Sequence, residues 1–195
     1  MYVQREQKRT SLIYEVPNVF TPEECNKIIN LDGEWKDGTI KAEHMVTFEI
    51  DEVKRKSKVK FVNSEEVLNK FSPYVDKAME AKGWKWKLTG ADQFQITEYK
   101  EGEYYGWHSD KFESPREDGT NRLMSCVLQL SDPTTYEGGD VEVEAYRLSK
   151  EQGSISFFPA FAAHQVQPVT KGNRYSLIAW YHGQDVEGLP YDRLT

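Results

Sequence analysis

Residues 99–110 read YKEGEYYGWHSD. This stretch is the strongest single indication of the fold, and the rest of the sequence is consistent with it. Alternating segments lie on either side of a turn at Gly102, which predicts two strands joined by that turn. In an extended strand, residues i and i+2 point to the same face, with Cα atoms roughly 6.5 Å apart. His108 and Asp110 can therefore both reach one ion, while Ser109 faces away. Such a short motif occurs by chance in many chains, so it needs support from elsewhere.

Short alternating segments separated by turn residues continue through the C-terminal half of the chain. They follow two predicted helices, and this order predicts an α+β fold: a double-stranded β-helix, or jelly roll, with the N-terminal helices packed on one sheet. We expect a single domain over residues 1–195, with helical support at about 11–85 and the jelly-roll core at about 90–182. The predicted core strands are Asp92–Tyr99, Tyr104–His108, Leu123–Leu130, Asp140–Tyr146, Ser154–Phe158, Ala163–Val169 and Tyr175–Tyr181.

The first helix has a clear start signal. Residues 11–20 alternate well enough for an opening strand, and Thr21 follows as a candidate N-cap. Pro22 suits the first helical position, and Glu24 lies three residues after the cap, as in a capping box. We expect this helix to end near Gly33.

A second helix is predicted from about Ser64 to Ala81, because its apolar residues form a stripe at helical spacing. Pro73 lies within that span and is expected to kink or split the helix. Between the two helices, residues 44–62 indicate one or two strands interrupted by a basic segment, Lys54–Lys60. Its plain interpretation is a solvated loop or an edge strand protected by lysines.

Composition narrows the class of protein. The chain has 195 residues and a formal net charge of −7 at pH 7, which disfavours a general affinity for nucleic acid or membrane headgroups. The first ten residues lack the apolar core of a signal peptide, and no apolar run approaches the roughly 20 residues that cross a bilayer.

Cys25 and Cys126 fall in a predicted helix and a predicted strand, so we expect two reduced, buried thiols. We therefore expect a cytoplasmic protein, with a monomer favoured.

A third candidate ligand, His164, stands just after the turn at residues 159–162 and begins an apolar strand. A jelly roll can bring this strand beside that of His108, so that one metal bridges both. Two imidazoles and one carboxylate form the facial triad that is typical of mononuclear iron sites and leaves coordination positions open. Zinc can use the same ligands, so the sequence alone does not decide the metal.

Arg174 follows His164 by ten residues and begins another predicted strand. If the two strands are neighbours joined by the turn at residues 171–173, Arg174 points into the cavity that contains the metal. A guanidinium fork matches the two oxygens of a carboxylate, which suggests an anionic co-substrate. Tyr99 could add a hydroxyl to the same carboxylate. The alternative is a surface arginine paired with one of the many acidic residues.

Three stretches together carry a family resemblance: YKEGEYYGWHSD, then YEGGDVEV at residues 136–143, then GSISFFPAFAAHQVQPVTKGNRYSLIAWY at residues 153–181. They resemble the core of prolyl 4-hydroxylase-type Fe(II)/2-oxoglutarate-dependent dioxygenases, most closely the bacterial and phage PKHD-type hydroxylases. The resemblance is strong over residues 90–182, whereas residues 11–85 are similar only in layout. Collagen-type members have lysine at the position of Arg174, so arginine favours the PKHD-type and oxygen-sensing branches.

The resemblance implies roles for particular residues. His108, Asp110 and His164 would bind Fe(II), and no further catalytic residue is implied. Arg174 would bind the C5 carboxylate of 2-oxoglutarate with help from Tyr99. Two more residues are implied in the co-substrate pocket: Trp180, where the family often has tryptophan, and Gln129, where relatives often have tyrosine.

The chemistry implied is hydroxylation of a C–H bond with O2 as oxidant and release of succinate and CO2, with ascorbate as a candidate reductant. A prolyl residue in a peptide or protein is the expected substrate. Candidate substrate-binding residues are Tyr105 and Trp107, and Arg55 and Lys56 if the basic segment is a lid. Two alternatives stay open: the same chemistry on a free amino acid, small metabolite or nucleobase, and a non-catalytic jelly-roll module with structural or zinc-binding histidines.

Overall fold

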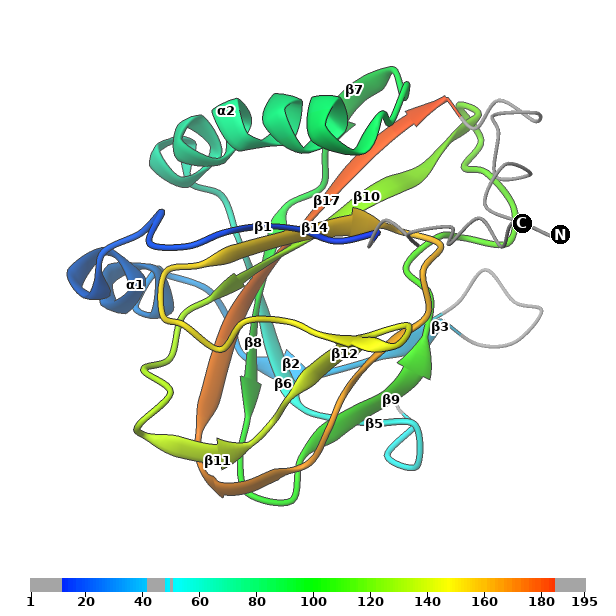
Figure 1. Cartoon of the computed structure of the whole chain (residues 1–195). Coiled ribbons are helices and arrows are strands. Elements are labelled where there is room, and N and C mark those ends of the chain that lie inside the picture. Colours follow the sequence, from blue (N-terminus) through cyan, green and yellow to red (C-terminus); the bar gives the residue numbers. More distant parts are fainter. Residues whose placement is uncertain (1–11, 42–47, 50, 185–195) are drawn as a thin grey trace, which may run out of the picture.

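The computed structural model describes residues 12–41, 48–49 and 51–184, and a large eight-stranded sheet runs through its middle (Figure 1). The longest strand, β17 (Arg174–Gln184), pairs β10 along one edge and β8 and then β7 along the other. Across the sheet the order is β1 (Tyr14–Val16), β14 (Ile155–Pro159), β10 (Thr120–Gln129), β17, β8 (Phe94–Tyr99), β6 (Lys58–Val62) and β2 (Lys36–Asp37), with β7 (Leu88–Ala91) beside β17.

A smaller, five-stranded sheet carries the predicted histidines. Its order is β13 (Tyr146–Arg147), β12 (Val141–Val143), β15 (His164–Val166), β9 (Tyr104–His108) and β5 (Arg55–Lys56). Two separate pairs complete the described strands: β11 (Tyr136–Gly138) with β16 (Val169–Gly172), and β3 (Ile40–Lys41) with β4 (Phe48–Glu49). The chain is thus mostly β-sheet with two helices, in line with the predicted α+β class.

The first helix, α1 (Pro22–Ile29), begins as its sequence predicts. Thr21 Oγ1 accepts a hydrogen bond from the backbone N–H of Glu24, and the Glu24 carboxylate accepts one from the backbone N–H of Thr21. The helix stops earlier than expected, because Asn30 caps it by donating its side-chain amide to Asn26 O. The capping box is therefore confirmed, and the predicted end near Gly33 is a few residues too late.

The second helix, α2 (Glu65–Lys82), agrees closely with the predicted span. Ser64 caps its N-terminus, and Gly83 ends it in the left-handed conformation with φ 67°. The expected split at Pro73 is wrong, since one helix runs through this residue. Pro73 lies on the exposed side of the helix, where the ring does not disturb the packed face.

Two buried clusters use alternate residues of the large sheet. Cys126 and Leu177 belong to the first cluster, together with Phe71 of α2 and Ile28 of α1. Val127, the next residue after Cys126, belongs to the second cluster, which lies between the sheets. Because successive side chains of a strand point to opposite faces, each face of the large sheet has its own core.

A corner at Ser57 joins the two sheets along one edge. β5 pairs β9 of the small sheet, and immediately after Ser57 β6 pairs β8 of the large sheet. The interpretation of this basic segment as a solvated loop is wrong for Arg55, Ser57 and Lys60, which are all buried. Lys60 donates to two carbonyls at the C-terminal end of α1, Ile29 O and Leu31 O. Movement of the segment as a lid stays a prediction.

Several predicted strands are divided in the structure. The predicted strand 140–146 becomes β12 and β13, with a turn at Glu144, whose φ is 52°. The predicted strand 163–169 becomes β15 and the start of β16, which pair with different partners. The opening strand covers only Tyr14–Val16, and part of the predicted strand region 44–62 lies outside the described residues.

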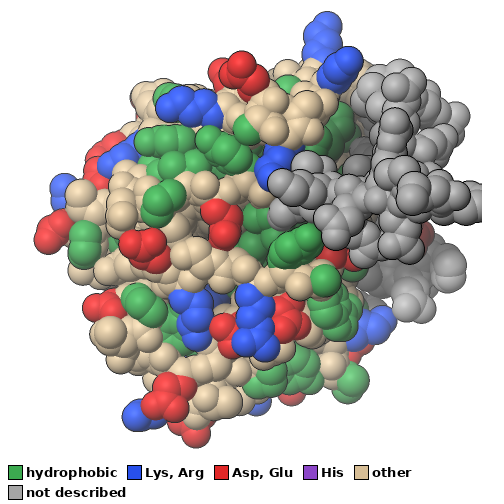
Figure 2. All heavy atoms as spheres, in the orientation of Figure 1, with side chains coloured by type: hydrophobic (Ala, Val, Ile, Leu, Met, Phe, Trp, Pro, Cys, Tyr) green, Lys and Arg blue, Asp and Glu red, His purple; other side chains and the backbone are tan. Residues whose placement is uncertain are grey.

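Surface charge is mixed on the face drawn in Figure 2, where acidic and basic side chains are interspersed. Neither helix in the described part of the chain has the length and apolar character needed to cross a membrane.

Candidate metal and co-substrate site

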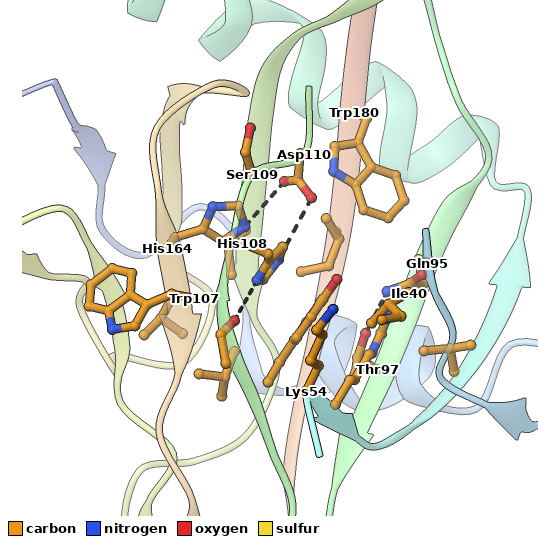
Figure 3. A pocket seen from close by; sticks show the side chains of 18 of the residues that line it. Ile40, Lys54, Gln95, Thr97, Trp107, His108, Ser109, Asp110, His164 and Trp180 are labelled. Carbon is orange, nitrogen blue, oxygen red and sulfur yellow. Dashed lines mark hydrogen bonds and ion pairs between the residues drawn. The ribbon is translucent and has the colours of Figure 1, made fainter. Parts of the chain in front are cut away.

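The predicted metal ligands come together at one end of the small sheet. His108 ends β9, His164 begins β15, and the two residues are direct partners in this antiparallel pair. One ligand atom from each histidine and one from Asp110 lie within 4.8 Å of one another. Figure 3 shows the three side chains pointing toward a common centre. The structure thus confirms that the strand of His164 lies beside that of His108.

Asp110 reaches the cluster by a different route from the one predicted. Strand β9 ends at His108, and the chain then bends, with the N–H groups of Asp110 and Lys111 both donating to Ala160 O at 2.9 Å. The Ser125 hydroxyl donates to Asp110 Oδ2 at 2.6 Å. A bend fixed by Ala160 and a hydroxyl from β10, rather than strand alternation, places this carboxylate.

Backbone carbonyls fix the orientation of both imidazoles. His108 Nδ1 lies 2.8 Å from Gly106 O, and His164 Nδ1 lies 2.9 Å from Ala162 O. An N–H at Nδ1 that donates to a carbonyl leaves the lone pair at Nε2, the usual arrangement of a metal-binding histidine. The Nε2 atoms lie 3.9 Å and 3.3 Å from Asp110 oxygens, for His108 and His164 respectively.

The protonation states of the three groups suit a cation at their centre. Burial, together with the charge of His164, lowers the pKa of His108 to about 3, so this ring is neutral at physiological pH. Burial opposes ionisation of Asp110, but the neighbouring His164 outweighs it and lowers the pKa of the carboxyl. Burial disfavours the charged form of His164 as well, yet contact with the Asp110 carboxylate raises its pKa. The carboxylate that raises the pKa of His164 would equally favour a divalent cation between these groups.

Arg174 is a buried cation, with 1% of its surface exposed. Nη2 donates to Gln129 Oε1 at 2.9 Å and Nη1 to Ser176 Oγ at 3.3 Å, and neither acceptor carries a charge. Gly139, with φ 61°, packs so closely that a Cβ there would lie 2.9 Å from Arg174 Cδ. The surface-arginine alternative is thus excluded, and the guanidinium is available to an anion in the cavity.

Tyr99, Trp180 and Gln129 surround this cation or the cavity beside it. Tyr99 is the cross-strand partner of Arg174, and its ring centroid lies 5.7 Å from Arg174 Cζ. Burial raises the pKa of Tyr99, so its hydroxyl keeps its proton and can donate. Trp180 lines the cavity, and its buried Nε1 has no hydrogen-bond partner in the part of the chain that the structure describes. Gln129 lies behind Arg174 and also donates to the hydroxyl of Tyr136 at 2.9 Å.

One cavity of about 790 Å³ contains both the metal cluster and Arg174. The expectation that the strands of His164 and Arg174 are neighbours is wrong: β15 belongs to the small sheet and β17 to the large one. The two side chains instead line the same cavity from opposite sheets. On β17, Arg174, Ser176, Ile178 and Trp180 all line it, which confirms the predicted shared face.

The four candidate substrate residues have different positions. Tyr105 lines the cavity and stacks on His108, with ring centroids 3.5 Å apart. Trp107 also lines it and is 52% exposed, which places this ring at the rim. Arg55 is buried in the cavity wall. Lys56, the next residue, is exposed and is not among the lining residues.

Sequence reasoning missed two side chains that support the site. Ser125, which bonds to Asp110, lies on the same strand face as Gln129, four residues later, so the alternation of β10 could have revealed it. Arg122 stacks on Trp180, with Cζ 3.7 Å from the ring centroid, and pairs with Asp92 at 2.9 Å. No short-range signal links Asp92 to Arg122, since the contact depends on how β7 and β10 flank β17.

Comparisons with known proteins agree with this geometry. Residues 94–182 match the family model described as the 2OG-Fe(II) oxygenase superfamily. A PKHD-type hydroxylase of Pseudoalteromonas atlantica is 36% identical over 93 residues, covering 44% of this chain and 41% of the relative. The chain therefore spans about two fifths of that relative's length. A PKHD-type hydroxylase of Shewanella sp. (strain MR-7) is 28% identical over 179 residues, covering 87% of this chain and 77% of the relative.

Solved structures share the fold. The viral collagen prolyl hydroxylase from Paramecium Bursaria Chlorella virus-1, in its 2OG complex, aligns with a TM-score of 0.66 and 18% identity, covering 89% of this chain and 97% of that one. A prolyl hydroxylase from Trichoplax adhaerens, in complex with a hypoxia inducible factor peptide fragment, aligns with a TM-score of 0.64 and 19% identity, covering 90% and 85%.

Proposed function

Residues 94–182 form the 2OG-Fe(II) oxygenase core of a prolyl hydroxylase-like chain, and from this premise we propose an Fe(II)- and 2-oxoglutarate-dependent dioxygenase that hydroxylates a C–H bond. One observation carries the proposal: a His-Asp-His cluster lines the same cavity as a buried arginine that has no carboxylate partner among the residues that the structure describes. The cluster suits a metal ion, and the arginine suits one carboxylate of a dicarboxylate whose other end binds that metal.

The donor set fits iron. Two neutral imidazole nitrogens and one carboxylate, without a thiolate, are typical of non-haem Fe(II) oxygenases. His108, Asp110 and His164 would bind the metal, and Ser125 would hold the Asp110 carboxylate in place. When bound, Fe(II), 2-oxoglutarate and O2 supply the oxidising chemistry that converts C–H to C–OH, with succinate and CO2 as co-products.

Arg174 would bind the far carboxylate of 2-oxoglutarate through its guanidinium fork. Tyr99 would donate its hydroxyl to the same carboxylate, because burial keeps this phenol protonated. Gln129 would orient the fork by accepting from Nη2, and Trp180 would offer its unpartnered Nε1 and its ring to the co-substrate. No residue is needed as a general acid or base, since the proposed residues bind, orient and exclude water.

The substrate we propose is a prolyl residue in a peptide or protein. Support comes from the two prolyl hydroxylases that share the fold and from the aromatic rim of the cavity. Tyr105 and Trp107 would contact the substrate chain, with Arg55 and Lys56 on the side of β5. The second candidate is the same hydroxylation of a free amino acid or small metabolite. Its one support is that a single cavity contains both Arg174 and the metal cluster.

We further propose that residues 1–195 act as one domain in which the N-terminal helices support the large sheet. Ascorbate would serve as an auxiliary reductant. A cytoplasmic location in a bacterial or phage-infected cell is the proposal that the bacterial relatives favour.

The proposal is tested by incubating the protein with Fe(II), 2-oxoglutarate, O2 and a library of proline-containing peptides. Succinate formation and a mass gain of one oxygen on a peptide are expected, and Asp110→Ala should abolish both. Succinate with an oxygenated small metabolite but with no peptide product would favour the second candidate. Absence of succinate in every reaction would contradict the dioxygenase proposal and favour a non-catalytic metal-binding module.

A further inference from the structure

Arg55 is an unusual residue for a cavity wall, because it is a cation with only 6% of its surface exposed. Its Nε donates to Ser57 Oγ and its Nη1 to Thr39 O, both at 2.9 Å. In the described part of the chain these acceptors are uncharged, so a salt bridge does not account for its burial. Another partner must explain why a guanidinium occupies this place.

That partner is an aromatic stack that ends on a metal ligand. Arg55 Cζ lies 4.5 Å from the ring centroid of Tyr105, a distance typical of a cation–π contact. The ring of Tyr105 also stacks on that of His108, with centroids 3.5 Å apart and planes inclined by only 10°. Guanidinium, phenol and imidazole therefore follow one another from β5 to the metal cluster, and Arg55 and Tyr105 are also paired in the strands.

The backbone around Arg55 is shaped to admit its side chain. A Cβ on Gly38 would lie 2.6 Å from Arg55 Nε and 2.4 Å from Ser57 Oγ, so only glycine fits beside this guanidinium. Gly38 N–H also donates to Ser57 O at 2.8 Å, which fixes the distance between the two segments. The close approach of Gly38 thus leaves no room for another side chain beside the Arg55 guanidinium.

The two histidines differ in what restrains their ring planes. Both have Nδ1 bonded to a carbonyl, which fixes the direction of one nitrogen. His164 is 6% exposed and has the edge of Phe158 beside it, with centroids 5.0 Å apart. His108 is less buried, and its parallel stacking partner is Tyr105. The His164 ring is tilted against His108 at 4.0 Å, so the parallel neighbour that restrains rotation of the His108 ring is the phenol of Tyr105, which also contacts Arg55.

We propose that Arg55 is a positioning residue for the metal site: through Tyr105 it fixes the ring plane of His108 and directs its Nε2 at the metal. The inference rests on the proposed metal site and adds to it a role for the basic segment. It accounts for the burial of Arg55, whereas Lys56, the next residue, is exposed.

The test measures metal binding alone, without co-substrate or turnover. Co(II) is titrated into the metal-free protein, and its visible ligand-field spectrum reports both affinity and coordination geometry. Arg55→Met should weaken Co(II) binding about tenfold, the usual scale for residues that orient a metal ligand, and should change the band shape. Lys58→Met is the matched control, because it removes a cation of the same segment that is paired with Asp37 at the surface.

A double variant separates positioning from a general structural role. In a Tyr105→Leu background the stack is already interrupted, so Arg55→Met should cause no further loss of Co(II) affinity. Additive losses would overturn the proposal, as would wild-type affinity in Arg55→Met. If Arg55→Met does not fold, Arg55→Lys serves in its place: it keeps the charge but loses the planar stack, so wild-type affinity there would also overturn the proposal. Failure of the wild-type protein to bind Co(II) would instead contradict the proposed metal site itself.

Discussion

His108 and His164 are direct cross-strand partners in β9 and β15, and their ring centroids lie 4.0 Å apart. Residues 56 positions apart in the chain thus lie in one candidate metal-binding cluster because two short strands pair at this register. Asp110 joins the cluster from the bend that follows β9. The geometry of the proposed metal site therefore depends on the pairing of the small sheet, whereas the position of Arg174 depends on the large sheet.

Arg174→Ala should raise the 2-oxoglutarate concentration needed for binding by about a hundredfold, because truncating a buried cation removes a charge-assisted pair and leaves the anion unpaired. Affinity for metal should be nearly unchanged, since Arg174 contacts Gln129 and Ser176 rather than the ligands. Isothermal titration of the Mn(II)-loaded protein with 2-oxoglutarate measures this directly. Lys171→Ala is the control, because Lys171 is an exposed cation on the adjoining strand. Equal 2-oxoglutarate affinity in Arg174→Ala and wild type would refute the co-substrate assignment.

Ser125→Ala should weaken metal binding about tenfold, because the hydroxyl that holds Asp110 Oδ2 at 2.6 Å would be lost. The change creates little cavity, so the metal-free protein should lose only about 1 kcal/mol of unfolding free energy. Metal affinity by calorimetry and urea unfolding separate the two effects. Ser156→Ala is a matched control: this serine is also buried in the large sheet, but it donates to Glu15 far from the metal ligands. A comparable drop in metal affinity for both variants would argue against a specific role for Ser125.

Phe71→Ala should lower the free energy of unfolding by about 3–5 kcal/mol, because Phe71 is fully buried between α2 and the large sheet. Its ring lies 6.0 Å from that of Phe94 and 6.5 Å from that of Phe157. Leu68→Ala, on the exposed side of the same helix, should change the stability by less than about 1 kcal/mol. Urea-induced unfolding of both variants measures the difference, and a similar small effect for both would contradict the packing of this helix face.

Cys25 and Cys126 should not react with thiol reagents in the native protein at pH 8. Burial raises the pKa of Cys25 to about 11, and it raises that of Cys126 as well. Because the folded pKa of Cys25 exceeds the unfolded value of about 8.5, this thiol stabilises the fold fully below pH 8.5 and loses that contribution as pH rises through about 11. Colorimetric thiol titration should detect no thiol in the native state and two in urea. Rapid native labelling would show that the two side chains are not buried.

Local signals allowed the starts of both helices to be predicted. Thr21 with Glu24, and Ser64, mark these starts through contacts within a few residues. The shared face of Arg174 and Trp180 follows from strand alternation alone. Features of this kind depend on neighbours in the sequence, which is why they could be predicted.

Pairing between distant strands could not be predicted in the same way. β15 and β17 belong to different sheets, and between them in the chain β16 pairs separately with β11. The burial of Arg55 depends on the space left by Gly38 and on the ring of Tyr105, neither of which is close to it in the chain. From its residue type alone, a charged side chain such as Arg55 is expected at the protein surface. Its burial becomes visible only in the packed structure.

The central claim is that this cavity binds Fe(II) and 2-oxoglutarate together, and anaerobic titration followed by visible absorption tests it most directly. Addition of both Fe(II) and 2-oxoglutarate should produce the weak metal-to-ligand charge-transfer band of the chelated co-substrate, while either one alone should not. Asp110→Ala should show no band, and Arg174→Ala should need far more 2-oxoglutarate to produce it. Absence of the band in the wild-type protein at saturating Fe(II) and 2-oxoglutarate would contradict the account.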